Sequence, residues 1–277
     1  MGMYIGVDIG GTKTLVAVLN EQGQIKEEVK FPTPKKYSNF ILELRNTVTH
    51  LKTKDFKAGG VAVPGLLDRK HGRAIKLGNL GWKNVPVQAD IEKIAKCPVV
   101  IENDANLAAL SESMLVPKAE SILYLTISTG IGTGVTRNQQ LDPGLLDIEG
   151  GQLLLPHKGK LAVWESFASG HAIVEHFGKQ AADIPASDVG TWNKIARNLA
   201  VGIYQLVAIV QPDLVVIGGS VGNYFDRYDA LLKQALKKYE LPVVPIPPIA
   251  RAKRPNEAVL FGCYDLAKQV YGRAKPN

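Results

Sequence analysis

Two stretches of the chain share one pattern, in which an apolar run enters a turn of glycine and threonine and leaves it as another apolar run. In the first stretch, the runs at residues 4–9 and 15–19 flank the turn at residues 10–14. In the second, residues 121–128 lead into a turn at residues 129–134. Apolar runs joined by a short glycine-rich segment predict β-hairpins. Because a whole supersecondary unit recurs, we expect two lobes of similar fold.

The rest of the hydrophobic pattern predicts further strands and helices. A helix is expected where Ile41, Leu44 and Val48 recur at helical spacing, with Ser38 as its N-cap. Apolar and β-branched runs predict strands at residues 24–31, 60–63, 97–102 and 214–217. Helical spacing predicts helices at residues 103–114, 164–177, 191–210, 229–239 and 257–271, and Asn256 is the predicted cap of the last one.

The order of these elements predicts an α/β fold of two lobes. We place one lobe at residues 1–116 with 258–277, so that the last helix returns to pack on it, and the other lobe at residues 117–257. The proline-rich segment 241–249 is predicted to form an edge strand, since proline cannot donate a hydrogen bond within a sheet.

Length and composition fit this two-domain interpretation. A chain of 277 residues with 45% hydrophobic residues can build two ordinary cores. The longest apolar run, at residues 199–210, is too short to span a bilayer, and no leader precedes the first strand. The two cysteines, Cys97 and Cys263, lie far apart and lack metal-ligand spacing. We therefore expect a cytoplasmic protein that is not bound to a membrane and keeps both thiols reduced.

The net charge of +7 raises the question of nucleic acid binding. Acidic residues such as Glu27 and Glu92 interleave the lysines, and no basic stripe or set of stacking aromatics is present. We therefore expect no nucleic acid partner, and a charge that aids solubility and attracts anionic substrates.

The first glycine turn has the chemistry of an anion site. Gly10 and Gly11 lack a Cβ atom, so their N–H groups can approach a ligand closely, and the hydroxyls of Thr12 and Thr14 can add donors. Asp8 would repel phosphate unless Mg²⁺ lay between them. A single such turn could be an ordinary hairpin. Its duplication favours a nucleotide or polyphosphate site.

Asp104 is the strongest candidate for a catalytic residue. With Asn103, it follows a predicted strand and begins a predicted helix. A carboxylate there can accept the proton of an attacking hydroxyl in phosphoryl transfer, or can simply cap the helix. Glu149 and Glu165 are candidates for binding sugar hydroxyls, although isolated acids are more often solvated. The pair Gly218-Gly219 permits close approach of an adenine ring, or forms a routine loop.

Together these residues resemble the ROK family of sugar kinases and repressors, within the actin-like ATPase superfamily. The resemblance implies a two-lobed actin-like (ribonuclease H-like) fold with a cleft between the lobes. It covers nearly the whole chain. The matching motifs are DIGGTKT at residues 8–14, VPGLLD at 63–68, GNLGWKNVPV at 78–87, PVVIENDANLAAL at 98–110, STGIGTGV at 128–135 and VVIGGSV at 215–221.

The resemblance also implies roles for individual residues. Asp8 would serve Mg²⁺, and Asp104 would be the base. The phosphates and nucleotide would be held by Gly10, Gly11, Thr12, Lys13, Thr129, Gly130, Gly132, Thr133, Gly218 and Gly219. The hexose would be bound by Gly65, Asn79, Asn103, Asp104, Glu149, Gln152 and Glu165, the last within WESFASG at residues 164–170.

One departure from the family pattern concerns zinc. The family usually carries Glu-x-Gly-His followed by a cysteine-rich zinc knot, whereas this chain has Glu149-Gly150-Gly151-Gln152 and no cysteine before Cys263. His157 alone cannot build a tetrahedral site, so we expect no zinc.

The family's repressors carry an N-terminal DNA-binding motif, and this chain begins at its first strand. The resemblance therefore disfavours a DNA-binding role.

Three functions follow from these observations. The first is an ATP-dependent hexose kinase that phosphorylates the 6-hydroxyl of glucose or a related hexose. The second takes phosphate from polyphosphate, as some compact relatives without zinc do. The third is a non-catalytic sugar sensor, which the missing histidine favours and the presence of Asp8 and Asp104 opposes. The identity of the hexose stays open, as does a homodimeric assembly.

Overall fold

A computed structural model of the chain describes residues 2–77, 80–254 and 257–272. The chain divides into two units. Unit 1 comprises Met1–Ser111 with Glu257–Asn277, and unit 2 comprises Glu112–Asn256. The first division lies inside helix α3 (Asp104–Ser113), a few residues before the boundary expected after residue 116. The helix crosses it without a break, which is why the sequence pattern carries no signal there.

Unit 1 is built on a five-stranded sheet with the order β3-β2-β1-β4-β8. Its strands are β1 (Met3–Ile9), β2 (Lys13–Asn20), β3 (Ile25–Pro32), β4 (Ala58–Ala62) and β8 (Val99–Glu102). The first three pair antiparallel, as predicted for a hairpin followed by a third strand, and β4 and β8 add in parallel. Every residue of β4 is buried, as is typical of a parallel strand covered on both faces.

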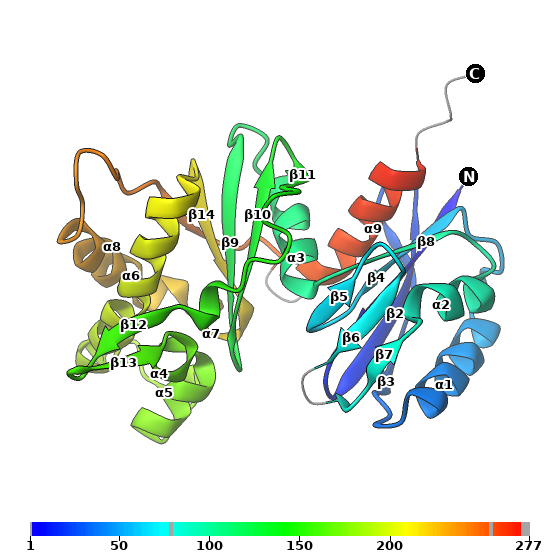
Figure 1. The fold of residues 1–277 in the computed structure, drawn as a ribbon, viewed down its shortest axis with the longest axis horizontal. Coiled ribbons are helices and arrows are strands. Elements are labelled where there is room, and N and C mark those ends of the chain that lie inside the picture. The colour runs from blue at the N-terminus through cyan, green and yellow to red at the C-terminus, as the bar shows by residue number, and fades with distance from the viewer. Residues whose placement is uncertain (1, 78–79, 255–256, 273–277) are drawn as a thin grey trace. The chain divides into compact units, whose positions relative to one another are not determined.

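Helices cover both faces of this sheet (Figure 1). Ile5 and Val7 of β1 share a buried cluster with residues of α1 (Tyr37–His50) and α2 (Val87–Ala95). Tyr4, one position out of phase, packs with Tyr264 of α9 (Ala258–Tyr271) on the opposite face. The prediction that the last helix returns to the first lobe is confirmed. A smaller three-stranded sheet of β5 (Leu66–Asp68), β6 (Arg73–Lys76) and β7 (Lys83–Val85) was not anticipated.

Unit 2 repeats the sheet of unit 1. Its five strands have the order β11-β10-β9-β14-β15, with three antiparallel strands followed by two parallel additions. They are β9 (Ser121–Ile127), β10 (Ile131–Arg137), β11 (Gln140–Leu141), β14 (Leu214–Gly218) and β15 (Ile249–Arg251). The internal repeat predicted from the two glycine turns is therefore confirmed at the level of sheet topology.

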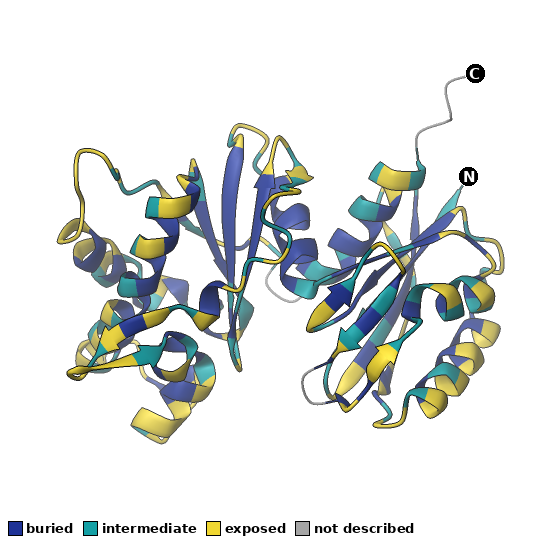
Figure 2. Ribbon diagram, viewed as in Figure 1, coloured by how far each residue is buried: buried dark blue, intermediate teal, exposed yellow. Residues whose placement is uncertain are grey.

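The core of unit 2 centres on the long helix α6 (Val189–Val210), whose buried face includes Trp192, Leu199 and Ile203 (Figure 2). Helix α8 (Asp229–Lys237) contributes Leu232 and Leu236 to the same cluster. The remaining elements are β12 (Leu154–His157), β13 (Lys160–Val163), α4 (Glu165–Ala168), α5 (Gly170–Phe177), α7 (Gly219–Gly222) and the 3₁₀ turns η2 (Gly150–Gln152), η3 (Ala181–Asp183) and η4 (Phe225–Arg227).

Several local predictions were wrong. Ser38 lies inside α1, which Lys36 precedes as N-cap without a side-chain bond. The helix predicted at residues 164–177 is broken at Ser169, whose hydroxyl accepts the N–H of Ala172 at 3.2 Å and starts α5. The segment predicted as an edge strand does lie at the edge of its sheet, but it forms a strand only at Ile249–Arg251, because the prolines before it lack N–H donors. The predicted cap Asn256 lies outside the described residues.

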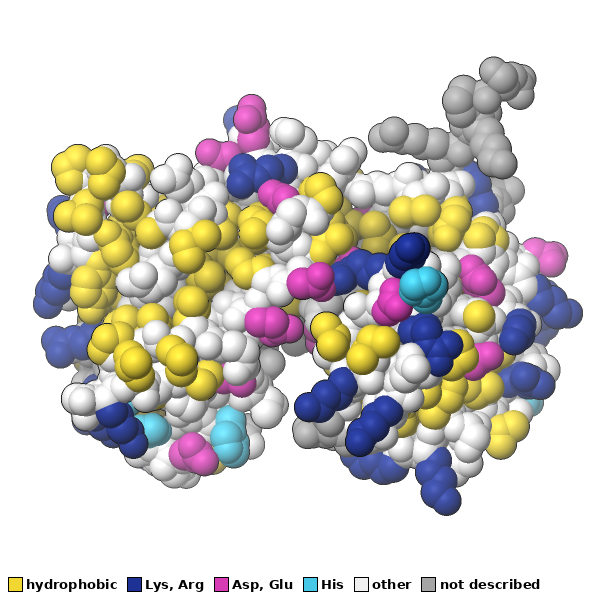
Figure 3. Space-filling view, viewed as in Figure 1, with side chains coloured by type: hydrophobic (Ala, Val, Ile, Leu, Met, Phe, Trp, Pro, Cys, Tyr) yellow, Lys and Arg dark blue, Asp and Glu magenta, His cyan; other side chains and the backbone are white. Residues whose placement is uncertain are grey.

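The positive charges are spread over the surface and do not gather in one basic patch on the face shown in Figure 3. Figure 3 shows Lys and Arg side chains scattered over the face of unit 1, with acidic side chains and a histidine among them. Most of the excess positive charge belongs to this unit. Within the described residues, no helix has both the length and the hydrophobicity that crossing a bilayer requires.

The close packing of α9 on β4 generates a stability prediction. A Cβ atom on Gly60 would lie 2.0 Å from the carbonyl oxygen of Cys263, and backbone cannot move aside cheaply. We expect Gly60→Ala to lower the free energy of unfolding by about 1–3 kcal/mol, measured by urea denaturation. Gly11→Ala is the matched control, because a Cβ atom there would have no neighbour within 4 Å. Equal stability of the two variants would contradict this account of the packing.

Candidate active site

The parallel register of unit 1 brings its predicted site residues to one edge of the sheet. Asp8 of β1 lies opposite Ala62 of β4, which in turn lies opposite Glu102 of β8. The segments that follow these strands therefore leave the sheet at the same edge. These segments carry the first glycine turn, Gly65, and the pair Asn103-Asp104. Ligand sites of α/β proteins commonly lie at such an edge.

The first glycine turn is tight at Gly10 and open at Gly11. The N–H of Gly10 donates to the carbonyl of Lys13 at 3.0 Å, and a Cβ atom on Gly10 would lie 2.7 Å from that oxygen. Gly11 faces open space, and Thr12 and Lys13 are exposed. The turn thus presents backbone and two polar side chains to an approaching ligand, as an anion site requires.

The hydroxyl of Thr14 does not join this site. Thr14 is fully buried, and its hydroxyl bonds that of Thr33 at 2.9 Å. The Thr33 hydroxyl donates in turn to the carbonyl of Gly10 at 2.8 Å. The backbone N–H of Thr33 donates to the carbonyl of Thr12 at 2.9 Å. The prediction that Thr14 supplies a ligand donor was wrong. The two threonines instead brace the turn from inside, a role that no local sequence pattern signals for Thr33.

Asp8 and Asp104 form a pair of half-buried carboxylates. Burial raises the pKa of Asp8 from 3.8 to about 7, with a further contribution from the negative charge of Asp104 and an opposing one from Lys13. Burial also raises the pKa of Asp104, against the hydrogen bond from the N–H of Ala105. Two neighbouring acids that resist ionisation are suited to a cation and to proton transfer.

Asn103 and Asp104 are held by one shared donor. The N–H of Ala105 donates to Oδ1 of Asn103 at 2.8 Å and to Oδ1 of Asp104 at 2.9 Å. Asn103 precedes α3 and its side chain caps the helix, so the capping alternative is confirmed for Asn103, whereas Asp104 is the first helical residue. Each side chain has a second polar atom besides this oxygen. The second polar atom of each side chain is thus left to interact with a ligand at the junction of β8 and α3.

Two further residues of unit 1 were predicted to contact a sugar. Gly65 adopts φ +90°, and a Cβ atom there would lie 2.3 Å from the carbonyl oxygen of Lys76, so only glycine fits this position. Its contact with a sugar stays a prediction. Asn79 lies outside the described residues.

In unit 2, the second glycine turn is joined to Glu165. Oε2 of Glu165 accepts the N–H of Ile131 at 3.2 Å, and a Cβ atom on Gly130 would lie 2.6 Å from the same oxygen. The side-chain amide of Gln152 donates to Oε1 of Glu165 at 2.7 Å. Glu165 and Gln152 are therefore brought together beside the turn, while Thr129 at its tip is exposed.

Thr133 holds the segment that carries Glu149. Its hydroxyl donates to the carbonyl of Ile148 at 2.9 Å and accepts the N–H of Gly150 at 3.1 Å. Because Thr133 is buried and its hydroxyl is engaged, the predicted nucleotide contact does not fit its side chain. Glu149 is exposed in the bend that Thr133 fixes. Gly132, which lies opposite Thr126 on β9, is half-buried in the strand.

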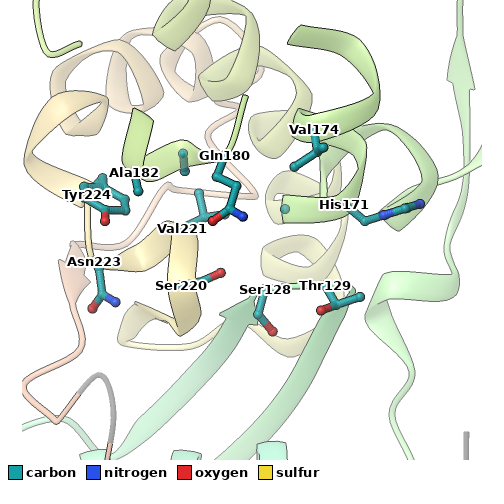
Figure 4. Close-up of a pocket in the computed structure, with 12 residues that line it drawn as sticks. Ser128, Thr129, His171, Val174, Gln180, Ala182, Ser220, Val221, Asn223 and Tyr224 are labelled. Atoms are coloured by element: carbon teal, nitrogen blue, oxygen red, sulfur yellow. The ribbon is translucent and has the colours of Figure 1, made fainter. Parts of the chain in front are cut away.

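A cavity of about 360 Å³ lies in unit 2 beside the second glycine turn (Figure 4). Gly218 and Gly219 shape the adjacent turn, since a Cβ atom on Gly218 would meet the Tyr124 hydroxyl at 2.2 Å and Gly219 adopts φ +78°. Thr129, a predicted nucleotide contact, lines this cavity, but most of the other lining residues were not predicted from the sequence. They are polar or aromatic side chains near these turns, chiefly His171, Gln180, Ser220, Asn223 and Tyr224.

The segment after Gln152 folds as the β12–β13 hairpin. The ring of His157 stacks on Phe167 with centroids 4.2 Å apart, and burial lowers the pKa of this histidine. Across the part of the chain that the structure describes, no three His, Cys, Asp or Glu side chains gather as a metal site.

The raised pKa of Asp8 predicts a pH-dependent stability. Between pH 4 and pH 7 the folded protein keeps a proton that the unfolded chain releases, so wild-type stability falls as pH rises through this window. Asp8→Asn cannot titrate and escapes this loss. In urea denaturation without divalent cations, its stability relative to wild type should increase by on the order of 1–3 kcal/mol from pH 4 to pH 8.

Asp68→Asn is a control of opposite sign. Hydrogen bonds from His71 hold the pKa of Asp68 below its usual value, so its carboxylate stabilises the folded state above pH 4. This variant should be less stable than wild type at pH 6. If the stability difference between Asp8→Asn and wild type stays constant from pH 4 to pH 8, the pKa of Asp8 is not raised in the folded protein.

Comparisons with known proteins agree with this arrangement. The family model described as "ROK family" matches residues 4–270. A glucokinase from Streptomyces coelicolor is 26% identical over 97% of this chain and 98% of its own length. An N-acetyl-D-glucosamine kinase from Citrobacter koseri is 28% identical over 94% and 97%. The crystal structure of a ROK family glucokinase from Streptomyces griseus, in complex with glucose and AMPPNP, superposes with a TM-score of 0.80 at 25% identity, over 97% of this chain and 100% of that one.

The match extends over nearly the whole chain and reaches both units. The structural neighbours share the two repeated sheets of the actin-like ATPase fold, as predicted from the sequence. The chain therefore belongs to the ROK family.

Proposed function

We propose that this protein is a hexose kinase that transfers the γ-phosphate of ATP to the 6-hydroxyl of glucose or a related hexose. The observation that carries the proposal is the pair of half-buried carboxylates, Asp8 and Asp104, at the edge of the sheet where the first glycine turn begins. A kinase needs a base for the attacking hydroxyl and a way to neutralise the phosphates, and these two acids are suited to the two tasks.

Asp104 is the proposed general base. Its raised pKa makes its carboxylate a better proton acceptor than an ordinary aspartate, and its position beside Asn103 gives the sugar hydroxyl a second hydrogen-bond partner. The N–H of Ala105 fixes one oxygen of each side chain and leaves the other polar atom of each to the substrate.

Asp8 is the proposed magnesium ligand. Mg²⁺ prefers one or two carboxylates together with water and phosphate oxygens, and the oxygen chemistry of Asp8 with Asp104 nearby fits that preference. When bound, the ion would neutralise charge on the phosphates. The open backbone at Gly11 and the side chains of Thr12 and Lys13 would then hold the phosphate oxygens.

Unit 2 supplies the proposed nucleotide and sugar groups. The cavity beside the second glycine turn has an aromatic side chain, Tyr224, and polar partners for a base and ribose (Figure 4). Thr129 and Gly130 at the turn would contact phosphates. Glu149, Gln152 and Glu165 would bind sugar hydroxyls, with the Gln152–Glu165 hydrogen bond rearranged or shared on binding.

The relatives support a hexose as acceptor, because those named above act by name on glucose and N-acetyl-D-glucosamine. The AMPPNP bound by the Streptomyces griseus enzyme supports ATP as donor, as does the cavity next to the glycine turn. Polyphosphate is the second candidate donor, since the exposed Thr12 and Lys13 would serve either phosphate chain. A sensor that only binds sugar would need no general base such as Asp104.

Asp104→Asn tests the enzyme directly. The amide keeps the shape and the helix cap but cannot take the hydroxyl proton, so kcat should fall about 10²–10⁴-fold. Sugar affinity measured by calorimetry should change far less. The assay follows phosphorylation of a panel of hexoses with ATP and with polyphosphate.

Asn103→Ala is the paired variant. It removes a hydrogen bond made in both the ground and the transition state, so it should weaken sugar binding and leave kcat largely intact.

If Asp104→Asn turns over hexose at the wild-type rate, Asp104 is not the catalytic base. Sugar binding by a wild-type protein that turns over no hexose with either donor would favour a sensor.

Tyr224→Ala tests the nucleotide cavity and the choice of donor. Base stacking on an aromatic ring contributes about 1–3 kcal/mol, so KM for ATP should rise roughly 10-fold while turnover with polyphosphate stays unchanged. Tyr239→Ala, which removes a partly exposed tyrosine outside the lining of this cavity, is the control. An unchanged KM for ATP in Tyr224→Ala would exclude this cavity as the base site.

A further inference from the structure

Glu102 ends β8, and its buried carboxylate gathers donors from several parts of unit 1. Arg69 donates Nε to Oε2 at 2.7 Å and Nη2 to Oε1 at 2.6 Å. Oε1 also accepts the backbone N–H of Asn103 at 2.7 Å and the side-chain amide of Asn106 at 3.0 Å. Only 4% of the Glu102 side chain is exposed, so these bonds are shielded from water.

The Arg69–Glu102 pair connects two segments that come together only in the fold. Arg69 follows β5, the strand that begins after Gly65, and Glu102 precedes Asn103 and Asp104. The planar guanidinium meets the carboxylate with two parallel hydrogen bonds, which fixes orientation as well as distance. The bridge thus holds the β5–β6 hairpin against the turn between β8 and α3.

Stability alone does not account for a buried ion pair at this place. Desolvation of the two charges offsets most of their attraction, and apolar residues of similar volume often stabilise a protein equally well. The pair does achieve a fixed geometry, however. Glu102 binds the backbone of Asn103 and the side chain of Asn106 through one oxygen, so it holds the turn on both sides of Asp104.

We propose that Arg69 and Glu102 are positioning residues, which set the orientation of Asn103 and Asp104 for phosphoryl transfer. The inference rests on the proposed function of Asp104 as the base. Without the arginine fork, Glu102 would lose two of its donors and the turn could shift. A displacement of the order of 1 Å in a catalytic group can reduce turnover about 100-fold.

Arg73 offers a matched comparison. It lies on β6 of the same small sheet, and its Nε donates to Oδ1 of Asn84 at 2.6 Å, with Nη2 donating to the backbone carbonyl of the same residue. Both acceptor atoms belong to Asn84 of β7 and not to the turn that carries Asp104. Replacing Arg73 therefore removes an arginine from the hairpin without touching Glu102.

The first experiment compares Arg69→Met, Glu102→Gln and Arg73→Met by steady-state phosphorylation of the best hexose, with each fold checked by circular dichroism. We expect kcat to fall about 10–100-fold in the first two variants, with KM for ATP unchanged, and to stay at the wild-type value in Arg73→Met. Adding Arg69→Met to Asp104→Asn should lower kcat little further, because both changes act on one group. Independent, multiplicative losses would overturn the inference. If Arg69→Met fails to fold, Arg69→Lys takes its place, since it keeps the charge and loses the fork.

The second experiment does not depend on catalysis. Hydrogen exchange of the Asn103 amide should be faster in Arg69→Met and Glu102→Gln than in wild type, and unchanged in Arg73→Met, because the Glu102 carboxylate accepts this N–H. Unchanged exchange in the first two variants would overturn the inference. If the wild-type protein phosphorylates no hexose, the proposed function fails, and faster exchange would still establish that the pair holds the turn.

Discussion

The register between parallel strands is the constraint on which the rest of unit 1 depends. Hydrogen bonding aligns Asp8, Ala62 and Glu102 across three strands, so the chain segments that follow them leave the sheet together. A shift of one residue in β1 would turn Asp8 from the side of α9 into the cluster that includes Ile5 and Val7. Unit 2 repeats the device, with Gly218 opposite Thr126 and Thr126 opposite Gly132, which brings its two glycine turns to one edge.

The same constraint explains how much of the structure the sequence could predict. Hydrophobic spacing and glycine turns are local signals, so the two repeated sheets and most helices could be predicted. Asp8, Asn103 and Asp104 could be placed because each ends or follows a recognisable strand. Contacts between distant segments leave no local trace. The Thr14–Thr33 hydrogen bond and the Arg69–Glu102 pair join residues 19 and 33 positions apart, and neither could be found from spacing.

Competing uses of a residue account for the wrong predictions. Ser169 has good helical neighbours, but its hydroxyl caps the next helix and breaks the predicted one. Thr133 belongs to a motif whose glycines suit a ligand, yet its hydroxyl bonds the bend that carries Glu149. The cavity-lining residues Asn223 and Tyr224 follow a glycine turn without any distinctive pattern. A local hydrogen bond decided the role of Ser169, whereas contacts with a distant segment decided the role of Thr133.

The return of α9 to the first sheet has a consequence for the way the protein is synthesised. Residues 112–256 form unit 2 as an uninterrupted segment, whereas unit 1 needs the last stretch of the chain to cover Tyr4 and Leu19. As the nascent chain leaves the ribosome, unit 2 can fold before its partner is complete. One face of the first sheet stays uncovered until α9 has been synthesised. Premature termination anywhere before α9 would therefore release a chain with exposed apolar surface, a natural substrate for chaperones and proteases.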